Sequence, residues 1–308
     1  MKKSLHNNAH LQGSLLLSFL ENIKKLYPWY SNYLVNYIPF DDLNYCTNVE
    51  ILLNKFNSFL KENGKDFNYG IDCYTRKISD LLDEELNFLR TGKYRYNSFD
   101  EVKERVYNNI EIMEYHTFGL LLMEILHQNN SKKISDFKDS LTENKDRIKN
   151  YLEIAGGHGL FVWEANRILG KHINVDFIDI SETSINIAKS FLKGIKVNFI
   201  CQDIFRFVTE MKYDFIVAGE VLEHLEKPEE LLFKIKDLLS EDGLCFISVP
   251  LNIPAIDHIY LFRNEQEIKN MIVNCKLNIK YDHIAPEYLS ITKGQNNLAQ
   301  SYWALLSK

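Results

Sequence analysis

A short glycine-rich turn between an apolar strand and an amphipathic helix constrains the fold more than any other feature of this sequence. The stretch 151–165 reads YLEIAGGHGLFVWEA. Residues 151–155 have the pattern of a buried strand, and the apolar residues after the turn recur at helical spacing. Because Gly156, Gly157 and Gly159 have no Cβ, a ligand can approach the peptide groups of the turn closely. The sequence therefore predicts a strand, a ligand-binding loop and a helix.

An acidic residue at the end of the next predicted strand indicates the kind of ligand. Asp179 closes the run INVDFID and lies 20 residues after Gly159, where a carboxylate can accept hydrogen bonds from both hydroxyls of a ribose. Nicotinamide and flavin dinucleotides require G-x-G-x-x-G, but the third position counted from Gly157 is Val162. The pattern therefore favours a nucleoside-containing ligand that is not a dinucleotide.

The acid and the alternate small residues before the helix resemble a known cofactor motif. Glu153, Ala155, Gly157 and Gly159 resemble motif I of the class I S-adenosylmethionine (SAM)-dependent methyltransferases, E-x-G-x-G-x-G, with Ala155 in the place of the first glycine. The plainer interpretation of a lone glycine loop is a tight structural turn. The resemblance implies SAM as the cofactor. The residues that it assigns to cofactor binding are Glu153, Ala155, Gly156, Gly157, Gly159, Asp179, Ile180, Asp203, Ile204 and Gly219.

Composition favours a globular protein in a reducing compartment. The 308 residues are 45% hydrophobic and have a net charge of −6, so nothing suggests the basic surface that grips nucleic acid. Five widely spaced cysteines without a C-x-x-C pair indicate reduced thiols. The apolar run 15–20 is too short to span a membrane or to form a convincing signal peptide. We expect a cytoplasmic protein.

The first half of the chain has the periodicity of helices. Between residues 14 and 149 apolar residues recur at helical spacing, and the expected breaks are Pro28, Pro39, Gly64, Gly70 and Gly92. The polar segment 129–135 is the expected linker inside this region. The predicted domains are a helical cap and substrate domain, 1–147, and a SAM-binding domain, 148–308.

From residue 151 onward short apolar strands alternate with helices, which predicts a parallel sheet covered on both faces. The runs LNIKYDHI and SYWALLSK have no helix between them, so they should pair antiparallel. The expected fold class is α/β, a Rossmann-like doubly wound, mostly parallel sheet with an antiparallel C-terminal hairpin, plus an all-helical N-terminal domain. This layout resembles that of the class I methyltransferases.

Two later segments extend the resemblance over about 160 residues. In CQDIF, Asp203 matches the acid of the family that bonds the adenine amino group, and Ile204 and Phe205 would flank the ring. The fourth predicted strand ends in Ala218 and Gly219, whose backbone would lie beside the methionine part of the cofactor. Taken alone, Asp203 could equally cap a turn.

A group of candidate metal ligands follows the fourth predicted strand. Glu220, Glu223 and His224 stand at i, i+3 and i+4, so a helix there would place all three on one face. His258 follows the fifth predicted strand, whose end borders the same cleft. Two carboxylates and two imidazoles suit a divalent cation such as magnesium, manganese, iron or zinc.

The E-x-x-E-H run and the later histidine resemble the ubiquinone-pathway O-methyltransferases and the small-RNA 3′-end methyltransferases, which implies a cation that activates a hydroxyl. The alternative is a metal-free site in which Glu223 and His224 merely start a helix. The candidate catalytic residues are His258, His224 and Glu220.

These features predict SAM-dependent methyl transfer to a small-molecule acceptor under a helical lid, with no nucleic acid or membrane as partner. One alternative is a SAM enzyme that transfers no methyl group, for example one that cyclises the aminobutyrate chain of SAM. Another is a non-catalytic SAM-fold scaffold, against which the intact Glu153, Asp179 and Asp203 argue. The sequence leaves open the acceptor, the atom methylated and the oligomeric state, with a homodimer as one option.

Overall fold

The computed structural model describes residues 12–286 and 299–308, and the chain divides into two compact units. One unit holds the described residues up to Ile78 and Tyr115–Lys133, and the other holds Ser79–Glu114 and the described residues from Ile134 onward. The units do not divide at residue 147, because parts of the predicted helical domain fold with the sheet. The functional boundary at 147 stays a prediction.

The first unit consists of helices, as the apolar periodicity predicts. Ser14 and Asp42 cap the first and third helices, because their side-chain oxygens accept hydrogen bonds from the backbone N–H groups of Leu17 and Tyr45. The helices wholly or partly in this unit are α1 (Leu15–Leu26), α2 (Pro28–Tyr37), α3 (Leu43–Glu62), α4 (Phe67–Thr91), α6 (Ile110–Leu126) and α7 (Gln128–Asn144).

Two predicted breaks in this region are wrong. Gly70 lies inside α4, where a Cβ would come within 2.6 Å of the Phe56 ring, so this glycine permits close helix packing rather than a turn. The expected linker 129–135 lies inside α7. Lys133 is buried there and pairs with Glu124 at 2.9 Å. Tertiary packing thus accounts for a glycine and a polar run that resemble loop signals.

The second unit is built on a seven-stranded sheet in the order β3-β2-β1-β4-β5-β7-β6. The first five strands pair parallel and β7 pairs antiparallel with both β5 and β6, so the predicted fold class and the terminal hairpin are confirmed. The strands are β1 (Asn150–Ile154), β2 (Asn174–Asp179), β3 (Asn198–Cys201), β4 (Tyr213–Gly219), β5 (Leu239–Leu251), β6 (Asn278–Pro286) and β7 (Gln300–Ser307).

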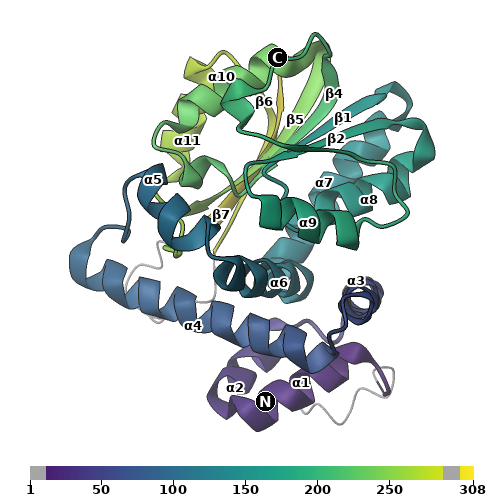
Figure 1. Ribbon diagram of the computed structural model, residues 1–308, viewed down its shortest axis with the longest axis vertical. Helices are drawn as coiled ribbons and strands as arrows, with labels where there is room; N and C mark the ends of the chain where they lie inside the picture. The colour runs from purple at the N-terminus through teal and green to yellow at the C-terminus, as the bar shows by residue number, and fades with distance from the viewer. Residues whose placement is uncertain (1–11, 287–298) are drawn as a thin grey trace. The chain divides into compact units, whose positions relative to one another are not determined.

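Helices cover both faces of the sheet (Figure 1). On one face Phe161 of α8 (Leu160–Leu169) and Phe137 of α7 lie against Phe246 of β5. On the other face, α10 (Pro228–Leu238) and α11 (Glu265–Asn274) pack with alternate strand residues such as Ile216 and Ile247 in one buried cluster. Further helices and short turns of this unit are α9 (Glu182–Phe191) and the one-turn 3₁₀ helices η4 (Lys145–Arg147), η5 (Gly170–His172), η6 (Ile204–Arg206) and η7 (Leu222–His224).

A segment that precedes the sheet by some forty residues also packs within this unit. It contains the short α5 (Phe99–Val102) and the π-helix η3 (Lys103–Tyr107). Val102 and Val106 are buried with Met113, and Ile256 and Ile259 pack against them. This segment is therefore fixed to the loop that follows β5. Among the described helices, none is both long and apolar enough to cross a bilayer.

Candidate active site

The predicted glycine loop joins β1 to α8. Ala155 and Gly157 both have positive φ, 53° and 52°, and a Cβ on Gly157 would meet nothing within 4 Å. The backbone at Gly157 is therefore open to a ligand. Glycine is needed at position 156 for a different reason, because a Cβ added there would lie 2.4 Å from the ring of Phe177. Ala155 adopts the left-handed conformation although it stands where the family motif has glycine.

Asp179 ends β2 beside this loop. The carboxylate accepts hydrogen bonds from the backbone N–H of Ser181 at 2.8 Å and of Gly157 at 3.3 Å, so the acid and the glycine loop form one structure. Burial raises the pKa of Asp179 to about 6. Ile180 follows and is 40% exposed. This arrangement can accept two ribose hydroxyls beside an apolar side chain.

Three other predicted cofactor residues, Glu153, Asp203 and Gly219, differ in burial and in hydrogen bonding. Glu153 is buried beneath the loop and accepts a hydrogen bond from the hydroxyl of Tyr151 at 2.7 Å, and burial raises its pKa to about 8. Asp203 accepts a hydrogen bond from the backbone N–H of Phe205 and so caps the turn that contains Ile204. Gly219 is the last residue of β4. Contacts of these residues with a cofactor stay predictions.

The helix expected from Glu220 to His224 is not present. Glu220 has φ of +52°, and only one 3₁₀ turn, Leu222–His224, follows it. The chain thus turns sharply after β4 and does not place Glu220 on a common helical face with Glu223 and His224. That helical prediction is wrong, and Glu220 lies outside the group that the other three predicted ligands form.

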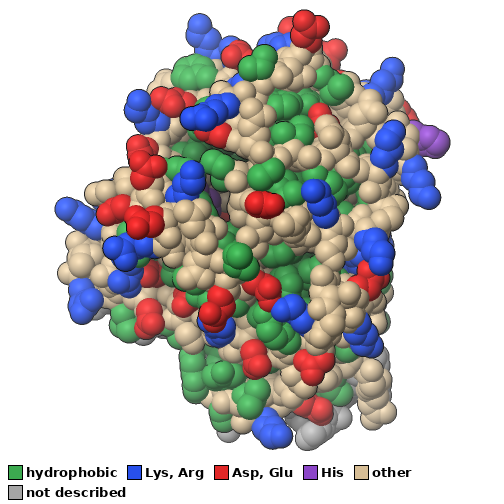
Figure 2. Space-filling view, in the orientation of Figure 1, with side chains coloured by type: hydrophobic (Ala, Val, Ile, Leu, Met, Phe, Trp, Pro, Cys, Tyr) green, Lys and Arg blue, Asp and Glu red, His purple; other side chains and the backbone are tan. Residues whose placement is uncertain are grey.

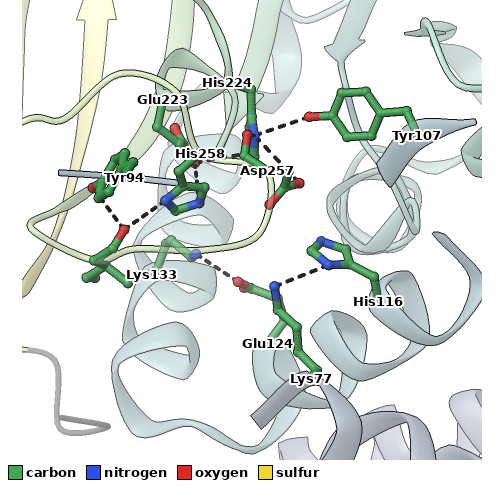
Figure 3. A network of polar contacts seen from close by, with 11 residues as sticks. Lys77, Tyr94, Tyr107, His116, Glu124, Lys133, Glu223, His224, Asp257 and His258 are labelled. Carbon is green, nitrogen blue, oxygen red and sulfur yellow. Dashed lines mark hydrogen bonds and ion pairs between the residues drawn. The ribbon is translucent and has the colours of Figure 1, made fainter. Parts of the chain in front are cut away.

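Glu223, His224 and His258 come together as a cluster whose ligand atoms all lie within 4.8 Å of one another (Figure 3). The side chain of Glu223 is fully buried. Its Oε1 lies 3.6 Å from Nε2 of His224 and 4.0 Å from Nε2 of His258. The carbonyl of Glu223 also accepts hydrogen bonds from the N–H groups of Ile259 and Tyr260, which ties the two loops together.

Backbone carbonyls determine the tautomers of both histidines. Nδ1 of His258 lies 2.8 Å from the carbonyl oxygen of Ile253, and Nδ1 of His224 lies 2.9 Å from that of Asp257. Because a carbonyl oxygen can only accept, each Nδ1 carries the proton in these contacts. Each Nε2 atom then carries a lone pair and lies within 4.0 Å of Oε1 of Glu223. Three acceptors that converge in this way favour a cation or an additional proton between them.

Three further residues of the site, Tyr94, Tyr107 and Asp257, were not among the residues predicted from the sequence. The hydroxyl of Tyr107 lies 3.3 Å from Nδ1 of His224, and the Tyr94 hydroxyl donates to the carbonyl of Ile253 at 2.9 Å. Asp257 places a carboxylate oxygen 3.6 Å from Nδ1 of His224. Asp257 could have been found from its position next to His258. The two tyrosines could not, because they precede the cluster by more than 100 residues.

A pocket of about 490 Å³ is lined in part by residues that follow Asp179 in the chain, although Asp179 itself is not among its lining residues. Phe99, Lys103 and Tyr107 line one side of it, and Ile180 and Ser181 line the other. The pocket therefore includes one predicted cofactor residue, Ile180, and its second wall comes from the segment that precedes the sheet. The remaining residues labelled in Figure 3 belong to the helical unit, where Lys77 contacts His116 at 3.3 Å and Lys133 pairs with Glu124.

Comparison with known proteins identifies the family. A methyltransferase domain family matches residues 125–282, just over half of the chain. The chain belongs to this family. A solved O-methyltransferase family protein from Burkholderia thailandensis aligns with a TM-score of 0.55 over 79% of this chain and 73% of that one, at 11% identity, which shows a shared fold.

Curated relatives of this methyltransferase-domain protein agree with the predicted resemblance. A ubiquinone biosynthesis O-methyltransferase of Rickettsia felis is 26% identical over 128 residues, which are 40% of this chain and 51% of that protein. A malonyl-[acyl-carrier protein] O-methyltransferase of Ilyobacter polytropus is 30% identical over 109 residues, which are 34% of this chain and 41% of that protein. The chain thus spans about half the length, or less, of these relatives. The class I SAM-dependent methyltransferase assignment is confirmed.

The residues of the loop fit the SAM cofactor of this methyltransferase family. The open backbone at Gly157 lets a ligand approach, and the carboxylate of Asp179 offers two acceptor oxygens at the end of β2. These features match a ribose with two neighbouring hydroxyls. Asp179 would hold that ribose, and the exposed side chain of Ile180 would contact the base.

Proposed function

We propose that this protein transfers the methyl group of SAM to the oxygen of a small-molecule acceptor beside the cluster of Glu223, His224 and His258. The observation that carries the proposal is the convergence of two histidine Nε2 atoms on one buried carboxylate. The cluster follows β4 and β5, and the glycine loop follows β1, so parallel pairing brings all three loops to the same edge of the sheet.

The donor set of the cluster suits a divalent cation that assists this reaction. Two imidazoles and a carboxylate are common ligands of zinc, iron and manganese, and three protein ligands leave positions for an acceptor. Glu223, His224 and His258 would hold the cation. When bound, it would lower the pKa of a hydroxyl group on the acceptor. The hydrogen bonds from Nδ1 of both histidines to backbone carbonyls keep the rings oriented for this task.

The transfer itself is an in-line displacement. A lone pair of the acceptor oxygen forms a bond to the methyl carbon while the bond from that carbon to sulfur breaks, and sulfur keeps the electron pair as S-adenosylhomocysteine (SAH) forms. The hydroxyl proton must leave, and Nε2 of His224 or His258 can take it where no cation is bound. Correct placement of the two reactants supplies much of the acceleration, roughly 7–11 kcal/mol in favourable cases.

We also propose that part of the helical region covers the acceptor site. Tyr94 and Tyr107, which precede the sheet, contact residues of the cluster or its loop within one compact unit. A substrate role for the rest of residues 1–147 stays a prediction. So do the cytoplasmic location and the exclusion of nucleic acid, although Figure 2 shows Lys and Arg scattered among Asp and Glu over the described part of the face drawn.

Chelation tests whether turnover depends on a divalent cation. SAH formation should be followed with SAM and a panel of phenols, aliphatic alcohols and carboxylic acids, with and without EDTA. We expect EDTA to reduce turnover of the accepted compound and a divalent cation to restore it, because removing the cation returns the hydroxyl to its ordinary pKa. Calorimetry should show that SAH still binds in the presence of EDTA, so the loss of turnover is not a loss of the cofactor site. Full turnover after exhaustive chelation would leave His224 and His258 as bases in a metal-free site.

A further inference from the structure

The π-helix η3 places one tyrosine between two parts of the site. π-helical turns are rare and often mark functional sites. Tyr107 is the last residue of η3 and lines the same pocket as Ile180 and Ser181. Its hydroxyl also contacts His224 (Figure 3). Tyr107 therefore lines the pocket that contains the predicted cofactor residue Ile180 and also contacts the cluster.

The contact with His224 leaves the hydroxyl proton of Tyr107 available. The carbonyl of Asp257, at 2.9 Å, accepts the proton on Nδ1 of His224, so the Tyr107 oxygen at 3.3 Å can only share it as a second acceptor. The hydroxyl of Tyr107 can therefore still donate a hydrogen bond to a ligand.

The segment around Tyr107 contacts the two loops that carry the cluster residues. The backbone N–H of Phe99 donates to a carboxylate oxygen of Glu226 at 3.0 Å. The buried side chains of Val102 and Val106 pack with Ile256 and Ile259, on either side of His258. A displacement of this segment would therefore move a wall of the pocket and the surroundings of both histidines together.

We propose that Tyr107 is a positioning residue that couples the cofactor pocket to the Glu223–His224–His258 cluster, so that SAM and a divalent cation each strengthen the binding of the other. The inference rests on the proposed function, because it requires a cation at the cluster. Both ligands need the same placement of the segment 99–107. The ligand that binds first orders this segment. The second ligand then binds without the loss of conformational entropy that ordering the segment requires.

Calorimetry on the full chain tests the coupling, with SAH as the unreactive cofactor probe and with Mn²⁺ and, in a second series, Zn²⁺ as the cation. In the wild type we expect a saturating cation to strengthen SAH binding by about tenfold, a usual size for such coupling. Hydrogen exchange in 99–107 should slow with either ligand alone. Tyr107→Phe should bind both ligands but with coupling of less than about twofold.

Tyr96→Phe is the matched control, because Tyr96 packs against the same buried residues of the segment and lies outside the pocket lining. It should keep the wild-type coupling. Unchanged coupling in Tyr107→Phe, or equal loss in Tyr96→Phe, would overturn the inference. Cation binding without coupling in the wild type would overturn it and leave the proposed function standing. If the wild type binds neither Mn²⁺ nor Zn²⁺, both the coupling and the cation fail.

Discussion

Replacement of Asp179 by alanine should weaken SAM binding by at least about tenfold. The carboxylate is expected to accept two ribose hydroxyls, and hydrogen bonds to a charged group contribute roughly 1.5–3 kcal/mol each. Calorimetry with SAM measures the change directly. Asp176→Ala is the matched control, because it removes a carboxylate from the same strand without removing a contact to the glycine loop. Equal SAM affinity in Asp179→Ala and the wild type would refute the ribose assignment.

The pH dependence of SAM binding provides an independent test of the role of Asp179. Burial raises the pKa of Asp179 to about 6, and the ribose hydroxyls require the deprotonated carboxylate. Wild-type SAM affinity should therefore be constant above this pKa and should fall as the pH decreases through about 6, by up to about tenfold per pH unit. Asp179→Ala should lose this dependence.

Replacement of Glu223 by glutamine should cause a large loss of affinity for the proposed cation. Even partners that only orient a metal ligand contribute about 10–100-fold to metal affinity, so loss of a ligand should cost more than about 100-fold. Turnover that depends on the cation should fall in parallel. SAH affinity without a cation should stay within about twofold of wild type, because Asp179 is on another strand.

A neutral side chain at position 223 should not destabilise the cation-free fold. A buried carboxylate is costly unless a positive charge compensates it, and glutamine keeps the volume while removing the charge. Thermal melting with and without Zn²⁺ checks this. The wild type should gain stability with Zn²⁺ and Glu223→Gln should not, whereas Glu230→Gln, at an exposed ion pair, should behave like the wild type. Stabilisation of Glu223→Gln by Zn²⁺ equal to that of the wild type would refute the assignment.

Local patterns were sufficient to predict the sheet and the glycine loop. The strand that ends before Ala155, the acid at Asp179 and the final antiparallel pair all follow from short-range periodicity and from the number of residues between strands. Gly70 was misjudged because a helix tolerates glycine where a ring such as Phe56 packs closely. That contact joins two helices and leaves no signal in the residues next to Gly70.

Prediction of the site from the sequence has the same limit, because contacts between distant segments leave no local signal. The sequence correctly grouped Glu223, His224 and His258, because carboxyl ends of parallel strands share one edge. It placed Glu220 with them because i, i+3 and i+4 spacing resembles a helix, and a residue other than glycine gives little sign of positive φ. Tyr107 was missed because only the tertiary fold brings a π-helix more than 100 residues away to His224.

Methyl transfer from SAM to a small molecule is tested most directly by mass spectrometry of the products formed from SAM whose methyl group carries an isotopic label. The protein is incubated with labelled SAM and a mixed small-molecule extract. We predict the label in a small-molecule product together with an equal amount of SAH. Methylthioadenosine in place of SAH, with no transfer of the label, would contradict this prediction and indicate a SAM enzyme that cleaves the aminobutyrate chain. Unconsumed SAM despite tight binding would indicate a non-catalytic SAM-binding protein.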